Sequence, residues 1–151
     1  MNPGYVNPYL FAAGLATAAA GLVHLMIPLG GPSWYALFGA PRALVRKAEA
    51  RELYPTLSCM VIATLLFICA AYAFSGASLL PVLPLLQTGL TGIAAVFLLR
   101  GIGFVALEWV RPGSLAKVSG NRGMDAFLVV SSLICLSIGA LYLMGILVRY
   151  G

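Results

Sequence analysis

Two titratable side chains interrupt the apolar parts of this chain, and either could carry chemistry. His24 is the single histidine, and Arg100 follows twenty mostly apolar residues and precedes ten more that are nearly apolar. A histidine inside a membrane segment could shuttle a proton, ligate a metal or bind a lipid headgroup, and an arginine could bind an anion. The alternatives are a hydrogen-bonded histidine at the membrane surface and an arginine whose long side chain reaches the interface.

These two residues are expected to lie at a similar depth. At 1.5 Å per residue, a helix that starts near residue 80 places Arg100 about 30 Å along its length, at one membrane boundary. Arg42 and Glu108 then lie just outside that boundary. We therefore predict one polar cluster of His24, Arg42, Arg100 and Glu108 that binds an anionic headgroup or a small anionic ligand.

Other site chemistries are not favoured. One histidine excludes a haem held by two histidines of this chain, and no clustered ligands indicate zinc. The three cysteines, Cys59, Cys69 and Cys135, form no CxxC motif and lie in apolar runs, where we expect them to pack as small apolar residues. No cofactor and no metal are therefore expected. Paired carboxylates or a nucleophile beside a base do not occur in the apolar runs.

Four apolar runs must position these residues. The chain has 151 residues, of which 62% are hydrophobic and 9% are charged, against about 25% charged residues in a soluble domain. About 20 apolar residues span the roughly 30 Å hydrocarbon core as a helix, and backbone groups inside a bilayer must bond internally. We predict a single all-α domain over residues 1–151, an integral membrane four-helix bundle with spans at 9–28, 55–74, 80–99 and 126–148.

Basic residues predict the orientation of the bundle. Arg42, Arg46, Lys47 and Arg51 lie between the first two runs, and residues 111, 117 and 122 supply the basic side chains between the last two. The positive-inside rule places both loops in the cytoplasm and both termini outside, in an inner membrane. Because the net charge of +5 is concentrated in these short loops, we expect contact with anionic lipid and no nucleic-acid binding.

The segments between the runs carry local signals. Pro41 can open a short helix over residues 41–52, whose many charges indicate a position at the lipid interface or in solvent. Pro81 and Pro84 are expected in the first turn of the third helix, where a missing N–H costs little. A tight connection beginning at Ser75 predicts that the second and third helices form an antiparallel hairpin, and Asp125 is expected to open the fourth.

Small residues predict where helices approach one another. Ala12, Ala16 and Ala20 form one row in the first run, with Gly21 beside them, and later runs offer Gly89, Gly92 and Gly139. Small residues four apart allow close backbone approach in lipid, either within the chain or at an interface with a second copy or another protein. Polar residues inside the runs, Thr17 and Thr91 among them, are expected to bond across helices or else to line a pore.

Residues 21–41, GLVHLMIPLGGPSWYALFGAP, resemble part of the pattern of small DoxX-like bacterial membrane proteins. Those proteins are similar in length and in having four spans. The resemblance implies a bacterial inner membrane protein with four helices. The lysine that the family often carries after the glycine region of its first helix has no counterpart here, so no functional residue is transferred from it.

Three functions compete on these observations. The first is a non-enzymatic accessory, scaffold or self-assembling subunit of a membrane complex, which rests on short loops and small-residue rows. The second is a binder or carrier of a lipid or of a small hydrophobic or anionic ligand, which would use the polar cluster. The third, an enzyme acting on a lipid, is the least favoured because no catalytic pair occurs in the spans. The expected partners are membrane lipid and either a homo-oligomer or a larger membrane complex.

Overall fold

Four long helices make up most of the molecule. The computed structural model describes residues 6–110 and 122–151, without the side chains of residues 104, 105, 107, 108 and 122–126, and no strand occurs in this part of the chain. The prediction of an all-α chain with four helices able to cross a membrane is confirmed. The long helices are α1 (Pro8–Gly30), α4 (Leu53–Gly76), α5 (Leu86–Val110) and α7 (Arg122–Tyr150), and the short ones are α2 (Pro32–Leu37) and α3 (Arg42–Glu49).

Helix α1 begins and ends at residues suited to those positions. The Asn7 side chain accepts hydrogen bonds from the backbone N–H groups of Tyr9 and Leu10, which have no partner within the helix. Pro8 follows at the first helical position, where its missing N–H costs nothing. The helix ends before Gly31, whose φ of 70° lies in the left-handed region that a side chain would disfavour.

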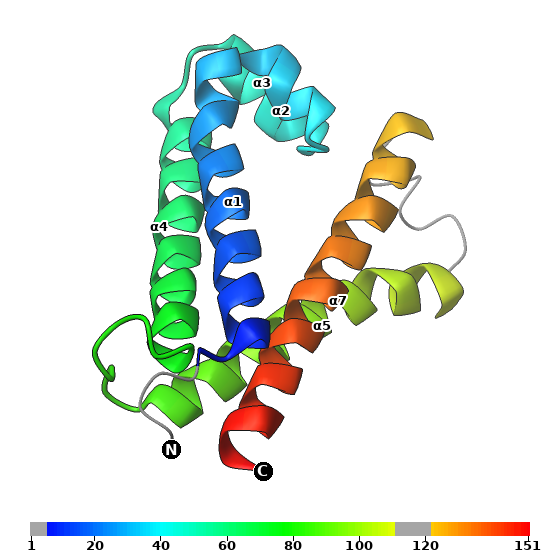
Figure 1. Ribbon diagram of the computed structural model, residues 1–151. Coiled ribbons are helices and arrows are strands. Elements are labelled where there is room, and N and C mark those ends of the chain that lie inside the picture. The colour runs from blue at the N-terminus through cyan, green and yellow to red at the C-terminus, as the bar shows by residue number, and fades with distance from the viewer. Residues whose placement is uncertain (1–5, 111–121) are drawn as a thin grey trace.

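The long helices are arranged as two pairs. Helix α1 packs along α4, where Gly21 admits the ring of Phe67, and α5 packs along α7, where Gly139 admits Leu98. Figure 1 shows α1 and α4 side by side, α5 crossing them at a steep angle, and α7 leaning away from α1 toward the end that carries α2 and α3. The two pairs meet most closely where α1 begins and α7 ends, with Leu10 against Gly145.

The third long helix begins six residues later than predicted, and the expectation that Pro81 and Pro84 lie in its first turn is wrong. Residues 77–85 instead form an irregular connection. The Ser75 hydroxyl donates to the carbonyl oxygen of Pro81 at 2.8 Å and accepts from the N–H of Leu83 at 3.1 Å. Leu85 has a φ of 53°, so the backbone is not helical immediately before Leu86. Because α5 then crosses the first pair, α4 and α5 do not form the tight antiparallel hairpin expected.

The buried core lies at the junction of the four long helices. Its largest members are Leu10, Leu90, Ile138 and Tyr142, which come from α1, α5 and α7. Many large apolar side chains instead face outward along all four helices. Soluble monomers rarely expose apolar patches of this extent, so the exposure agrees with lipid as the surrounding solvent.

A second, smaller apolar cluster holds the short helices against the end of the first pair. Ile27 of α1, Tyr35 of α2 and Cys59 of α4 form its buried part, and Leu44 and Val45 of α3 pack against it. From the same region, the ring of Phe38 meets the ring of Phe127 of α7 edge-on, with centroids 6.2 Å apart. The predicted short helix is therefore present as α3, and its position at a membrane surface stays a prediction.

Candidate functional site

His24 lies six residues before the end of α1 and is half-buried. Its Nδ1 is 2.8 Å from the carbonyl oxygen of Ala20, one turn earlier. A carbonyl oxygen can only accept, so Nδ1 carries the hydrogen of this bond. His24 is therefore hydrogen-bonded within its own helix, and its position at a membrane surface stays a prediction.

Arg100 lies inside α5 and not at its end. The residue comes 14 positions after Leu86, which at 1.5 Å per residue is about 21 Å along the axis, and ten further residues follow it. It is exposed, its charge acts on the thiol of Cys135 on the neighbouring α7, and it has interactions with other parts of the chain. The apolar segment Leu86–Gly103 is long enough to cross a membrane, and Arg100 lies three residues before its end, so its position at a membrane boundary stays a prediction.

The residues of the predicted polar cluster come from three helices, α1, α3 and α5. Arg42 is the first residue of α3, exposed and in contact with other parts of the chain, and Glu108 lies in α5 with its side chain outside the described set. The shared site stays a prediction.

Tyr142 is the polar residue that sequence reasoning missed. It is 0% exposed, and its hydroxyl donates to the carbonyl oxygen of Cys69 on α4 at 2.9 Å. Its ring stacks on Phe97 of α5, with centroids 6.0 Å apart and planes inclined by 13°. The oxygen of Thr17 on α1 lies 3.4 Å from the tyrosine oxygen. One side chain of α7 therefore contacts all three other long helices.

The hydrogens of this group can be assigned. Thr17 donates to the carbonyl oxygen of Ala13 at 2.7 Å, and Tyr142 donates to Cys69. Each hydroxyl has one hydrogen, so the contact between Thr17 and Tyr142 can be a hydrogen bond only when one of them gives up its carbonyl partner. Thr17 was expected to bond across helices, and the structure places it beside such a partner. Thr91 instead donates to the carbonyl oxygen of Gln87 one turn earlier in its own helix, at 2.9 Å.

Most of the predicted interface residues pack within the chain. A Cβ added at Gly21 would lie 3.2 Å from the Phe67 ring, and one at Gly139 would lie 2.8 Å from Leu98. Gly89 likewise faces the ring of Tyr72, Ala16 packs against the core, and Ala12 and Ala20 are half-buried. Gly92 differs, because a Cβ there would meet no atom within 4 Å.

Two buried hydroxyls have no hydrogen-bond partner among the described residues, those of Tyr35 and Ser132. Tyr35 lies in α2 beside Thr56 and Cys59, and burial raises the pKa of its hydroxyl. No three His, Cys, Asp or Glu side chains gather within the described residues into a group that could hold a metal ion. A nucleophilic hydroxyl must be hydrogen-bonded to a base, and the structure shows no such bond for either hydroxyl among the described residues.

No family model, curated protein or solved structure matches this chain. The resemblance to the DoxX-like proteins therefore rests on residues 21–41 and on the four-helix topology.

Proposed function

We propose that this protein is a non-catalytic membrane subunit that assembles with a further membrane helix, from a second copy or from another protein. The observation that carries the proposal is the open face of α5. A Cβ added at Gly92 or at Gly103 would meet no atom of the described residues within 4 Å. These glycines are eleven residues apart, which is about three helical turns, so they lie on the same side of the helix.

The residues between the two glycines complete a stripe at helical spacing. Val96 and Leu99 are 66% and 70% exposed. Together with Gly92 and Gly103 they occupy positions i, i+4, i+7 and i+11. Helices associate in lipid where small residues let two backbones approach and where larger side chains fill the space beside them. This stripe, Gly92–Val96–Leu99–Gly103, offers both.

The hydroxyl groups within the long helices support a structural role. Those of Thr17, Thr64, Thr91 and Ser137 each donate to a carbonyl oxygen one turn earlier in the same helix. The Tyr142 hydroxyl donates to a carbonyl oxygen of a neighbouring helix. A hydroxyl whose hydrogen satisfies a backbone carbonyl stabilises the helix or its packing and is not activated as a nucleophile.

Replacing Gly92 with leucine is expected to weaken assembly at least tenfold, because the added side chain would hold a partner backbone away from the stripe. The unfolding midpoint should stay near that of the unmodified protein, since a Cβ at this position meets open space. Native mass spectrometry of the protein extracted in a mild detergent, with chemical crosslinking in the membrane, measures the assembly.

Ala140→Leu is the matched control, because Ala140 is exposed on α7 and outside the stripe. It should leave assembly unchanged. Detection of the unmodified protein only as a monomer without partners would contradict the proposed function. So would a Gly92→Leu variant that assembles as the unmodified protein does.

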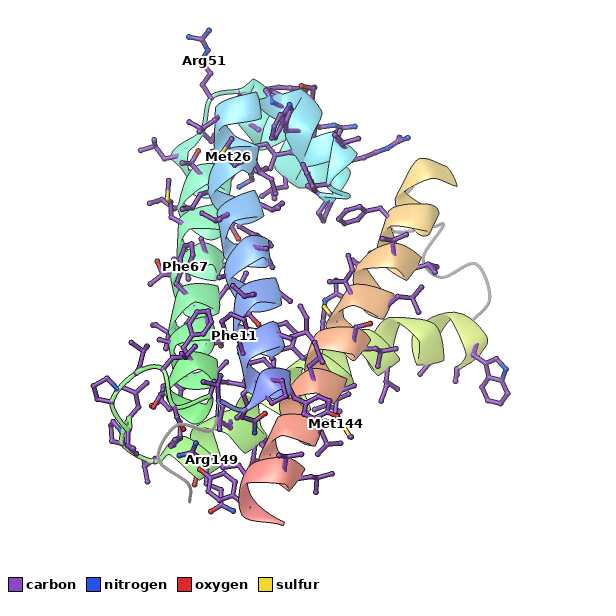
Figure 2. The ribbon with its side chains drawn as sticks, viewed as in Figure 1. Phe11, Met26, Arg51, Phe67, Met144 and Arg149 are labelled. Carbon is purple, nitrogen blue, oxygen red and sulfur yellow. The ribbon has the colours of Figure 1, made fainter. Side chains whose placement is uncertain are left out.

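The proposed membrane arrangement places both ends of the chain outside and α3 at the surface of the cytoplasmic leaflet of a bacterial inner membrane. It is supported by the larger number of basic residues at the end of the molecule that carries α2 and α3 than at the end where Arg149 lies. Arg51 projects from the end that carries α2 and α3, whereas Arg149 lies at the opposite end (Figure 2). Four basic residues lie between positions 42 and 51, and loops rich in lysine and arginine remain in the cytoplasm.

A second candidate function, binding of an anionic ligand within the membrane, is favoured by the position of Arg100. An exposed guanidinium offers five N–H donors in a planar fork that fits a carboxylate or a phosphate. Arg100 lies within the segment Leu86–Gly103, which is long enough and apolar enough to cross a membrane. Arginines within membrane-spanning segments usually mark a ligand or ion pathway.

Under this second candidate, Arg100→Leu should reduce the retention of a co-purifying anionic amphiphile at least tenfold, because the forked donor is lost. Native mass spectrometry of the two proteins measures the retained mass. Ala95→Leu, at an exposed position of the same helix outside the stripe, serves as the control and should retain the amphiphile. Equal retention by the Arg100→Leu variant and the unmodified protein would reject this candidate.

A further inference from the structure

Helix α3 is held in a fixed rotation by its apolar side. Leu44, Val45 and Ala48 are half-buried and pack against the cluster of Ile27, Tyr35 and Cys59. The other side of the helix is exposed, and Arg42, Arg46 and Glu49 follow one another on it at spacings of four and three residues. The apolar contacts therefore determine which charges face outward.

The charges around α3 are only partly neutralised within the chain. Lys47 is 3.4 Å from the Glu52 carboxylate and lies over the Tyr54 ring, 4.8 Å from its centroid. Among the described residues, no carboxylate lies within ion-pair distance of Arg46 or Arg51. Arg51 has a φ of 55° in the turn after α3, and Figure 2 shows its side chain projecting away from the helices. Residues 42–52 carry four cations against two anions.

This part of the chain lies where headgroups meet the ends of the first helix pair. Helix α3 is between the last residue of α1, Gly30, and the first residue of α4, Leu53 (Figure 1). Trp34 and Tyr54 are exposed in the same region. Aromatic residues with a polar edge favour the headgroup level of a membrane, so the basic side of α3 falls at that level when α1 and α4 cross it.

We infer that Arg46 and Arg51, which we call the α3 basic surface, bind the phosphate groups of anionic phospholipid headgroups. Charge complementarity selects this occupant, because the surface combines a net positive charge with guanidinium groups that can bind phosphate through two N–H donors each. The cytoplasmic leaflet of a membrane supplies such phosphates at high local concentration. The inference does not depend on assembly through α5, since none of its residues belongs to the stripe.

The test uses the full chain purified in a neutral detergent and titrated with phosphatidylglycerol or phosphatidylcholine of the same acyl chains, with bound lipid counted by native mass spectrometry. The unmodified protein should bind the anionic lipid several-fold more tightly. The double variant Arg46→Gln, Arg51→Gln should bind it about 25-fold more weakly, or about fivefold for each cation removed. Gly92→Leu should bind lipid as the unmodified protein does, which separates this test from that of the proposed function.

Glu49→Gln is the matched control, because it neutralises an exposed charge of opposite sign on the same helix. It should strengthen binding of phosphatidylglycerol by a similar factor per charge. Equal binding of the two lipids, an unchanged double variant or weaker binding by Glu49→Gln would each overturn the inference. Displacement of the lipid by inorganic phosphate at millimolar concentration would also overturn it, because the surface would then take a free anion.

If the double variant does not fold, the salt dependence of lipid binding by the unmodified protein tests the inference. Exposed charges are screened over about 10 Å at 0.1 M salt and over about 3 Å at 1 M salt. The preference for phosphatidylglycerol over phosphatidylcholine should therefore fall steeply across that range of sodium chloride. A preference that is independent of salt would overturn the inference.

Discussion

Replacing Tyr142 with alanine is expected to lower the free energy of unfolding by about 3–5 kcal/mol, as truncation of large buried aromatic residues does. The side chain is fully buried where α1, α4, α5 and α7 meet. Its removal would leave a cavity that none of the four helices can fill without moving the others. Denaturant titration followed by circular dichroism in detergent, or steric trapping in bicelles, measures the change.

One further variant separates the ring of Tyr142 from its hydroxyl, and a control removes an exposed tyrosine. Tyr142→Phe keeps the stacking on Phe97 and removes one hydrogen bond, so we expect a loss of about 0.5–1.5 kcal/mol. Tyr54→Ala removes a tyrosine that is 58% exposed and should cost less than about 1 kcal/mol. If Tyr142→Ala cost no more than Tyr54→Ala, Tyr142 would not join the four helices as described.

The sequence predicted the long helices because their signal is local. Twenty consecutive apolar residues determine a span whatever their neighbours are, and α1 and α4 accordingly begin and end within two residues of the prediction. The start of α5 was wrong because its cause is tertiary. The Ser75 side chain binds the backbone of residues 81 and 83, and nothing in the spacing of the two prolines indicates that contact.

The candidate site shows the same limit. Sequence spacing identified Gly21, Gly89, Gly92 and Gly139 as positions of close approach, but which of them face the chain itself depends on how each helix is rotated. Three of them receive side chains of the neighbouring helices, and Gly92 faces outward. Tyr142 could not be paired with Thr17 and Cys69 for a related reason, since that contact requires the register between α7 and the first helix pair.

Gly145→Val is expected to lower the free energy of unfolding by about 2–4 kcal/mol, from overpacking and the loss of one buried hydrogen bond. A Cβ at this position would lie 2.7 Å from Leu10 Cδ2 and 3.1 Å from the backbone nitrogen of Leu10. The leucine tip could move, but the backbone of α1 could not without separating from α7. Gly103→Ala is the control, because a Cβ there meets no atom, and it should stabilise the helix by up to about 1 kcal/mol.

Separation of α1 from α7 would also affect the start of α1. Asn7 donates to the carbonyl oxygen of Gly145 at 2.8 Å and accepts from the N–H groups of Tyr9 and Leu10. Gly145→Val is expected to break the first of these bonds by moving α1 away from α7. Asn7→Ala should therefore lower the free energy of unfolding by about 1 kcal/mol less in the Gly145→Val background than in the unmodified protein. Strictly additive effects would show that the cap and the contact of α1 with α7 act independently. In that case, the first turn of α1 would form independently of the contact between the two helix pairs.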